Sequence, residues 1–169
     1  MKNYYKYVDE DKTECFLELD EDFFCERAIY KTGNNVINTY LEIEHESYFL
    51  PEGNLKDSLE FMMVSSKVEF DTLWKESMMK SESNWNTLKM KYEIGDLVIS
   101  RILCFYPQGI ISNFGEEFNA LSDFKTCQEK FGKEKMYPNK EIELRISGFD
   151  NINKLILLGV RNIEYNKKS

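Results

Sequence analysis

Residues 92–123, YEIGDLVISRILCFYPQGIISNFGEEFNALSD, and residues 137–161, YPNKEIELRISGFDNINKLILLGVR, decide the fold of the C-terminal half of this chain. Apolar side chains alternate with polar ones in these stretches, which is the period of strands that bury one face. Turn-forming residues such as Gly109 separate the alternating runs. The predicted strands cover residues 97–106, 109–113, 118–121, 141–149 and 154–161.

A short helix is predicted between the third and fourth of these strands. Residues 122–131 place Phe124, Cys127 and Phe131 on one side at helical spacing, and Gly132 supplies a stop signal. We expect this helix to plug one end of a small five-stranded barrel.

The order of these pieces resembles the S-one-type RNA-binding domain, which is an oligonucleotide/oligosaccharide-binding (OB) barrel. The resemblance covers residues 92–161, about two-fifths of the chain. The pieces that carry it are Ile94-Gly95-Asp96, Pro107-Gln108-Gly109, Gly115, Leu121-Ser122-Asp123, Asn139-Lys140 and Asp150. It implies single-stranded RNA as a ligand, with candidate contacts at Arg101, Phe105, Tyr106, Phe118 and Lys154.

The positions of the family's stacking rings differ in this chain. Members that bind RNA generally present aromatic residues on the second strand, and an aromatic residue and a histidine on the third. Here Gln108 precedes the second strand, Ile110 and Ile111 lie in it, and Ala120 stands where the histidine would fall. Exposed isoleucines would suit a protein interface, or packing against the first half of the chain. The resemblance therefore extends to the fold better than to the RNA-binding face.

The first half of the chain is predicted to form an antiparallel sheet with a covering helix. Three alternating strands at residues 13–19, 23–31 and 36–43 are joined by short polar turns. A helix is expected to start at Ser66, because Glu69 follows at capping-box spacing. The expected helix places four apolar residues on one face, and these are Phe70, Leu73, Trp74 and Met78. Residues 55–64 are compatible with either helix or strand.

The resulting fold class is α+β, with two modules. Residues 1–90 form the sheet-and-helix module, and residues 91–169 form the OB-like barrel. Residues 80–92 are polar apart from Trp85 and Leu88, which makes this segment the best candidate for an interdomain linker.

Charge is unevenly distributed along the chain. The net charge is −8; residues 1–90 carry 10 basic and 19 acidic side chains, whereas residues 91–169 carry 12 and 11. An acidic face repels a phosphate backbone and suits a basic protein partner, although simple solubility also explains it. The candidate partner-binding residues are Glu18, Asp20, Glu21, Asp22, Glu26, Glu44 and Glu46.

The sequence contains no catalytic, metal or cofactor motif. His45 is the only histidine, and no nucleophile signature accompanies it. The four cysteines form no C-x-x-C pair. Cys15 and Cys25 flank a predicted turn, where they would pair if they face each other, but without an export signal we expect reduced thiols in the core. Because these motifs are absent, we expect a non-enzymatic protein without a cofactor. The chain has neither an apolar run long enough to span a membrane nor a secretory signal, so we expect a cytoplasmic protein.

A second resemblance concerns function. The segments LELDEDFFCERAIYKTG (residues 17–33), LPEG (50–53) and EFDTLW (69–74) resemble small bacterial proteins, some of which are immunity proteins encoded beside secreted toxins. This resemblance implies a protein that binds and neutralises a basic toxin or effector domain. Single-stranded RNA binding by the barrel is the alternative.

Overall fold

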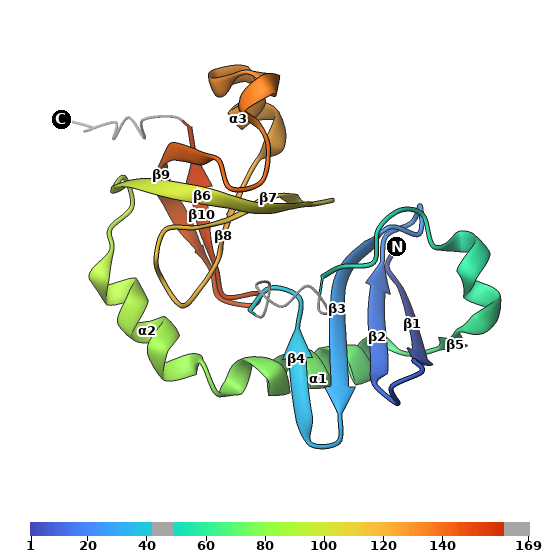
Figure 1. The fold of residues 1–169 in the computed structure, drawn as a ribbon. Coiled ribbons are helices and arrows are strands. Elements are labelled where there is room, and N and C mark those ends of the chain that lie inside the picture. Colours follow the sequence, from blue (N-terminus) through green and yellow to red (C-terminus); the bar gives the residue numbers. More distant parts are fainter. Residues whose placement is uncertain (42–48, 161–169) are drawn as a thin grey trace. The chain divides into compact units, whose positions relative to one another are not determined.

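The structure is a computed structural model that describes residues 1–41 and 49–160. The chain forms two compact units, Met1–Glu82 and Ser83–Ser169. The first unit contains an antiparallel sheet with a helix on it, and the second contains a closed barrel (Figure 1). The predicted α+β class and the two architectures are therefore confirmed.

The sheet of the first unit has five strands in the order β4-β3-β2-β1-β5, and all neighbours are antiparallel. Its strands are β1 (Asn3–Val8), β2 (Glu14–Leu19), β3 (Cys25–Thr32), β4 (Asn35–Asn38) and β5 (Met63–Val64). The sequence predicted only three of them. It missed β1 because tyrosines and a lysine, only half buried, replace the apolar residues of a typical core strand. The third predicted strand is shorter than expected, and residues 42–43 lie outside the described part.

Helix α1 (Lys67–Met79) covers one face of this sheet, as predicted. Ser66 caps it, because its hydroxyl accepts a hydrogen bond of 3.1 Å from the backbone N–H of Glu69. The buried side of α1 carries Phe70 and Trp74. The Phe70 ring packs against Tyr4 of β1 at a centroid distance of 5.6 Å, so the helix is held by aromatic contacts with the sheet.

The chain after residue 48 contacts β3 and the residue that precedes it. The hydroxyl of Tyr30 donates a hydrogen bond of 2.8 Å to the carbonyl of Phe49, and Phe24 forms an isolated bridge with Asn54. A short 3-10 helix, η2 (Lys56–Phe61), follows before β5. The segment at 55–64, which the sequence left open, is thus part 3-10 helix and part strand.

Cys15 and Cys25, on the neighbouring strands β2 and β3, do not meet. Cys15 pairs with Tyr30 across the β2–β3 ladder, whereas Cys25 pairs with Leu19, at the other end of β2. Leu19, the partner of Cys25, lies four positions after Cys15, which corresponds to roughly 13 Å along the strand. A disulfide needs Cα atoms less than about 7 Å apart. Both cysteines are buried and free.

The second unit is a closed barrel with the strand order β10-β8-β7-β6-β9. Its strands are β6 (Leu97–Tyr106), β7 (Gly109–Asn113), β8 (Ala120–Ser122), β9 (Glu141–Asp150) and β10 (Leu155–Gly159). Only β8 and β10 are parallel. A five-stranded barrel with a helix after its third strand is OB-like. The third strand starts at Ala120 rather than at residue 118, because Phe118 lies in the core before it.

The predicted linker is largely a helix, α2 (Glu82–Lys91), and it packs on the barrel. Trp85 is fully buried, and its ring contacts those of Phe118 and Phe149 at 5.0 and 6.0 Å between centroids. The polar surface of α2 suggested a linker, but Trp85 and Leu88, its two apolar anchors, are both buried, whereas Met90 is exposed.

Helix α3 (Phe124–Phe131) follows β8 and is capped at both ends, and its end at Gly132 is the one that the sequence predicts. The carboxylate of Asp123 accepts a hydrogen bond of 2.8 Å from the Thr126 N–H, and Gly132 ends the helix with φ of 91°. Phe124 packs against Phe105 at the end of β6, at 5.7 Å between ring centroids. A short 3-10 turn, η3 (Lys133–Lys135), leads on to β9. No helix in the described ranges is long and apolar enough to cross a lipid bilayer.

Candidate functional site

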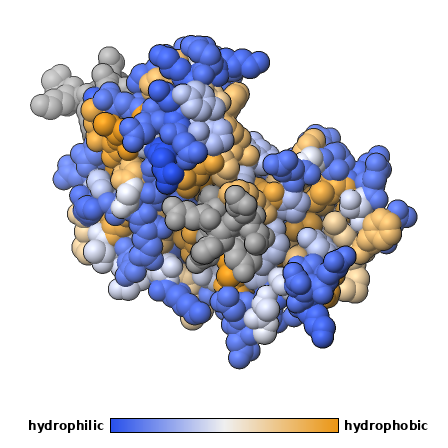
Figure 2. Space-filling model, in the orientation of Figure 1, coloured by the Kyte–Doolittle hydropathy of each residue, from blue (hydrophilic) through white to orange (hydrophobic). Residues whose placement is uncertain are grey.

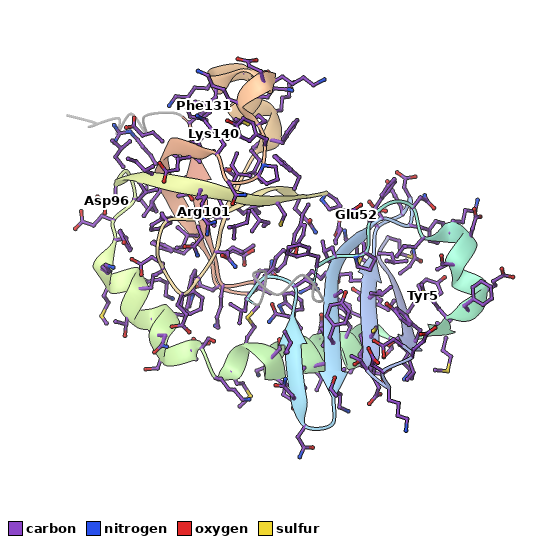
Figure 3. All side chains as sticks on the ribbon, in the orientation of Figure 1. Tyr5, Glu52, Asp96, Arg101, Phe131 and Lys140 are labelled. Carbon is purple, nitrogen blue, oxygen red and sulfur yellow. The ribbon has the colours of Figure 1, made fainter. Side chains whose placement is uncertain are left out.

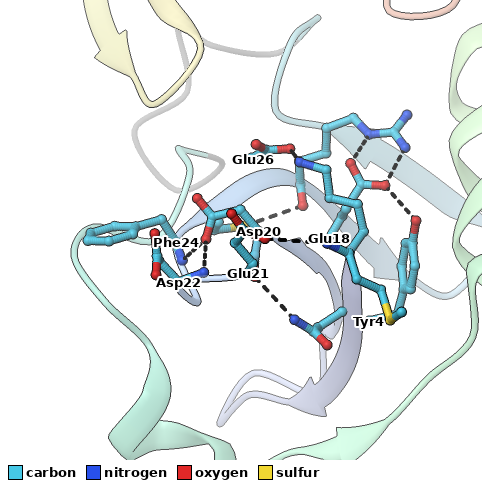
Figure 4. A network of polar contacts seen from close by, with 12 residues as sticks. Tyr4, Glu18, Asp20, Glu21, Asp22, Phe24 and Glu26 are labelled. Atoms are coloured by element: carbon cyan, nitrogen blue, oxygen red, sulfur yellow. Dashed lines mark hydrogen bonds and ion pairs between the residues drawn. The ribbon is translucent and has the colours of Figure 1, made fainter.

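A buried ion pair lies between the sheet and α1 of the first unit (Figure 4). Arg27 donates from Nε and Nη2 to the two carboxylate oxygens of Glu18, at 2.8 and 2.6 Å. The hydroxyl of Tyr4 donates to the same carboxylate at 2.9 Å. The guanidinium of Arg27 also lies over the rings of Phe70 and Trp74, at 5.1 and 4.7 Å from their centroids.

The pKa shifts in this network follow from burial and from the ion pair. Burial opposes ionisation of Glu18, but the hydrogen bonds and charge of Arg27 outweigh it and hold the pKa of Glu18 below its usual value. Burial and the hydrogen bond to Glu18 raise the pKa of Tyr4 to about 12. Glu18, predicted to face a partner, is therefore charged but turned into the protein, where Arg27 neutralises it.

The neighbouring Asp20 shapes the β2–β3 turn. Its Oδ1 accepts hydrogen bonds of 2.9 Å from the backbone N–H groups of Asp22 and Phe24. Between them, Phe23 has a φ of 63°, a conformation uncommon for an aromatic residue. The Asp20 carboxylate thus stabilises a tight turn that points its neighbours outward.

Residues of two separate segments meet at this turn and form what we call the acidic corner: Glu21, Asp22, Phe24, Glu52 and Asp57, all exposed. The side-chain amide of Asn54 donates a hydrogen bond of 2.5 Å to the backbone carbonyl of Asp22. The backbone N–H of Leu55 donates one of 3.0 Å to the backbone carbonyl of Phe23. Figure 3 places Glu52 at the end of the sheet where β2 ends and β3 begins. Glu52 and Asp57 were not among the predicted residues, because nothing in their spacing connects them with the turn.

Two cations lie close to the acidic corner. The terminal amino group of Met1 is 3.7 Å from Glu21, an exposed and weak pair, and Lys56 is exposed in the same segment as Glu52. Glu26, another predicted contact, forms an ion pair with Lys2. The remaining predicted acidic residues, Glu44 and Glu46, lie outside the described residues, as does His45.

Three of the residues proposed for RNA contact are buried. Phe118 packs on Trp85 in the core, and Tyr106 and Lys154 are almost fully covered. A buried ring offers no face on which a base can stack. Ile110 and Ile111, expected to be exposed in place of stacking rings, are also fully buried. The isoleucines therefore contribute to packing.

The other two predicted RNA contacts, Arg101 and Phe105, are exposed on β6. Arg101 Nη1 donates to Oδ1 of Asn139 at 3.1 Å, next to Lys140 (Figure 3). Phe105 is partly covered by Phe124. Arg101 and Phe105 are thus the part of the predicted RNA-binding set that a ligand can reach.

Within residues 1–41 and 49–160, no three histidine, cysteine or acidic side chains gather in a way that could hold a metal ion. Burial raises the pKa of all four cysteine thiols, which keeps them protonated at neutral pH.

Comparison with known proteins adds no assignment. No protein-family model matches the chain, and no curated protein sequence matches it.

Proposed function

We propose that this chain is a non-enzymatic, protein-binding protein of the toxin-neutralising immunity type, acting in the bacterial cytoplasm. Its acidic corner is the proposed contact for a basic toxin or effector domain. The observation that carries the proposal is the corner itself, where two segments joined at the β2–β3 turn expose four carboxylates and the ring of Phe24.

The chemistry of the corner suits a basic protein. Aromatic anchors surrounded by polar groups are typical of the centres of protein interfaces, and Phe24 would supply that anchor. The carboxylates would meet lysine and arginine side chains, and the net charge of −8 would steer such a partner toward the chain. Asp20 stabilises the turn, and hydrogen bonds from Asn54 and Leu55 join the second segment to it, so the corner would need little ordering on binding.

The proposal predicts that a neighbouring gene encodes a secreted toxin, and the test uses the effector domain of that toxin as the probe. Association rates of the wild type and of Glu21→Lys/Asp22→Lys are compared over a salt series. We expect the double variant to associate at least about tenfold more slowly at low salt, with the difference shrinking as salt is added. The wild type should also abolish the activity of the toxin.

A matched control separates the corner from net charge. Glu10→Lys/Asp11→Lys changes the charge equally at another exposed pair, in the β1–β2 turn at the other end of β2. Equal slowing by both variants would show that only net charge matters. Absence of binding to the toxin, or a toxin that stays active when bound, would contradict the proposed function.

Single-strand RNA binding by the barrel is the second candidate, and exposed Arg101 and Phe105 support it. Fluorescence anisotropy with labelled oligonucleotides tests it. Binding that weakens steeply with salt and is lost in Arg101→Ala and Phe105→Ala would favour RNA. Retained binding in both variants would contradict this use of the barrel.

A further inference from the structure

One edge of the first unit exposes large apolar side chains. Phe61 and Val64 are each 79% exposed, Val68 is 76% exposed, and Met63 is 56% exposed. They lie at the end of η2, in β5 and in the first turn of α1. In Figure 2, the surface over η2 includes hydrophobic atoms among hydrophilic ones. We call these four residues the β5 patch.

The β5 patch lies at a sheet edge with which no strand of residues 1–41 or 49–160 pairs. Strand β5 is the last in the sheet order, and its inner side pairs with β1 through Val64 opposite Tyr5 and Met63 opposite Lys6. The N–H of Ser65 also points inward, with a hydrogen bond of 2.9 Å to the carbonyl of Tyr4. Backbone groups of alternate strand residues point in opposite directions, so the N–H and C=O of Val64 point outward.

This edge lacks most of the features that prevent edge-to-edge pairing. Residues 61–66, FMMVSS, contain neither a charge nor a proline. Only the shortness of β5 limits the number of backbone hydrogen bonds that a new strand would form there. An uncharged, extended, apolar segment is the chemistry that fits this edge.

We propose that a second copy of this chain pairs with the edge through an antiparallel contact of β5 with β5, centred on Val64. Two-fold pairing at Val64 places the end carrying Phe61 of one copy against the end carrying Lys67 of the other, since both are three residues from Val64. A lysine over an aromatic ring is a favourable contact. The two Val64 side chains meet at the axis.

The charges around the patch also suit a second copy. Lys6 forms an ion pair with Glu69 at 2.7 Å, and Lys67 forms one with Asp71. Four charges on the rim are therefore neutralised in pairs, and exposed Glu60, beside Phe61, is a single further carboxylate, so the patch itself offers a strongly charged partner little. A two-fold contact uses the same surface on both copies and closes, leaving no further β5 edge. The interface is small, so the dimer should be weak, with a dissociation constant of about micromolar or higher.

Sedimentation velocity of the full chain, from about 5 to about 500 µM, tests the proposal. We expect a monomer–dimer equilibrium in the wild type. Val64→Lys, which places two like charges at the axis, should weaken dimerisation at least about tenfold. Phe61→Ser, a milder change, should weaken it as well. Met90→Lys, at an 81% exposed position in α2, is the matched control and should dimerise as the wild type does.

Two further results decide the proposal. Added salt should strengthen the dimer, because it screens the repulsion between two chains of net charge −8, whereas it should weaken binding through the acidic corner. The Val64 amide should exchange its hydrogen more slowly at high protein concentration. A wild type that stays monomeric throughout, or a dimer that Val64→Lys leaves unchanged while circular dichroism shows a folded chain, would overturn it.

Discussion

The indole Nε1 of Trp85 donates a hydrogen bond of 2.9 Å to Oδ1 of Asn151, and this contact joins helix α2 to the turn between β9 and β10. Lys89 donates to the same oxygen at 2.8 Å. A tryptophan in a segment that otherwise resembles a polar linker is thus part of the barrel core.

Replacing Trp85 should destabilise the barrel. Trp85→Ala removes a fully buried ring from between Phe118 and Phe149, so we expect a loss of about 3–5 kcal/mol in the free energy of unfolding. Hydrogen exchange, followed in peptides from the barrel, measures this loss of unfolding free energy. Lys89→Met, which removes the exposed hydrogen bond to Asn151 and a 5.9 Å cation–π contact with Trp85 but keeps the ring, should cost less than about 1 kcal/mol. Similar losses in both variants would contradict the assigned role of the ring.

Breaking the Glu18–Arg27 pair should destabilise the first unit. Arg27→Met leaves the Glu18 carboxylate buried without its main partner, which costs about 3–5 kcal/mol. In a Trp85→Phe background, the fluorescence of Trp74 alone reports urea unfolding of this unit. Adding Glu18→Leu should restore part of the loss, because no buried charge then remains. A double variant as unstable as the sum of the two single variants would exclude coupling between them.

The stability of the first unit should fall in acid. The folded-state pKa of Glu18 is below its ordinary value of 4.5, so the folded state binds this proton less readily than the unfolded state. The contribution of Glu18 is complete well above pH 4.5 and is lost as pH falls through the lowered folded value. Urea midpoints followed by Trp74 fluorescence should therefore decline less steeply between about pH 5 and pH 2 in Glu18→Gln. An unchanged slope would show that other groups cause the acid sensitivity.

A methyl group at Gly109 should disrupt the barrel. Gly109 has a φ of +145°, and a Cβ there would overlap the backbone carbonyl oxygen of Ser122 in β8. We expect Gly109→Ala to lower the thermal midpoint by several degrees or to prevent folding. Gly148→Ala is the control, because its added methyl would lie 3.6 Å from a Leu157 side-chain carbon, in ordinary contact. Equal midpoints for the two variants would contradict this assignment.

Local signals in the sequence predicted the parts of the fold that depend on neighbouring residues. The hydroxyl of Ser66 and the Glu69 N–H lie three residues apart, so their spacing alone predicts the start of α1. The alternation along residues 97–106 likewise predicts β6, because side chains of a strand point to opposite faces in turn. In both cases the interacting groups lie on one short segment.

The predicted site residues depended on contacts that spacing does not encode. Glu18 resembles Glu21 in sequence, yet it is buried against Arg27 from the next strand, whereas Glu21 is exposed. Phe118 resembles an exposed strand aromatic, yet Trp85, 33 residues earlier, packs on it. Glu52 joins the acidic corner only because the chain returns to the β2–β3 turn.

By itself, the sequence determined the α+β class, the segments that form the barrel strands, the start of α1 at Ser66, the end of α3 at Gly132 and the excess of negative charge in the first half. Each of these follows from composition or from the period of side chains along one segment. Only the tertiary structure decided which charges and rings face solvent, because exposure depends on the segments that fold over a residue. Burial therefore assigned Glu18 and Phe118 to the interior and left Glu21, Asp22 and Phe24 on the surface.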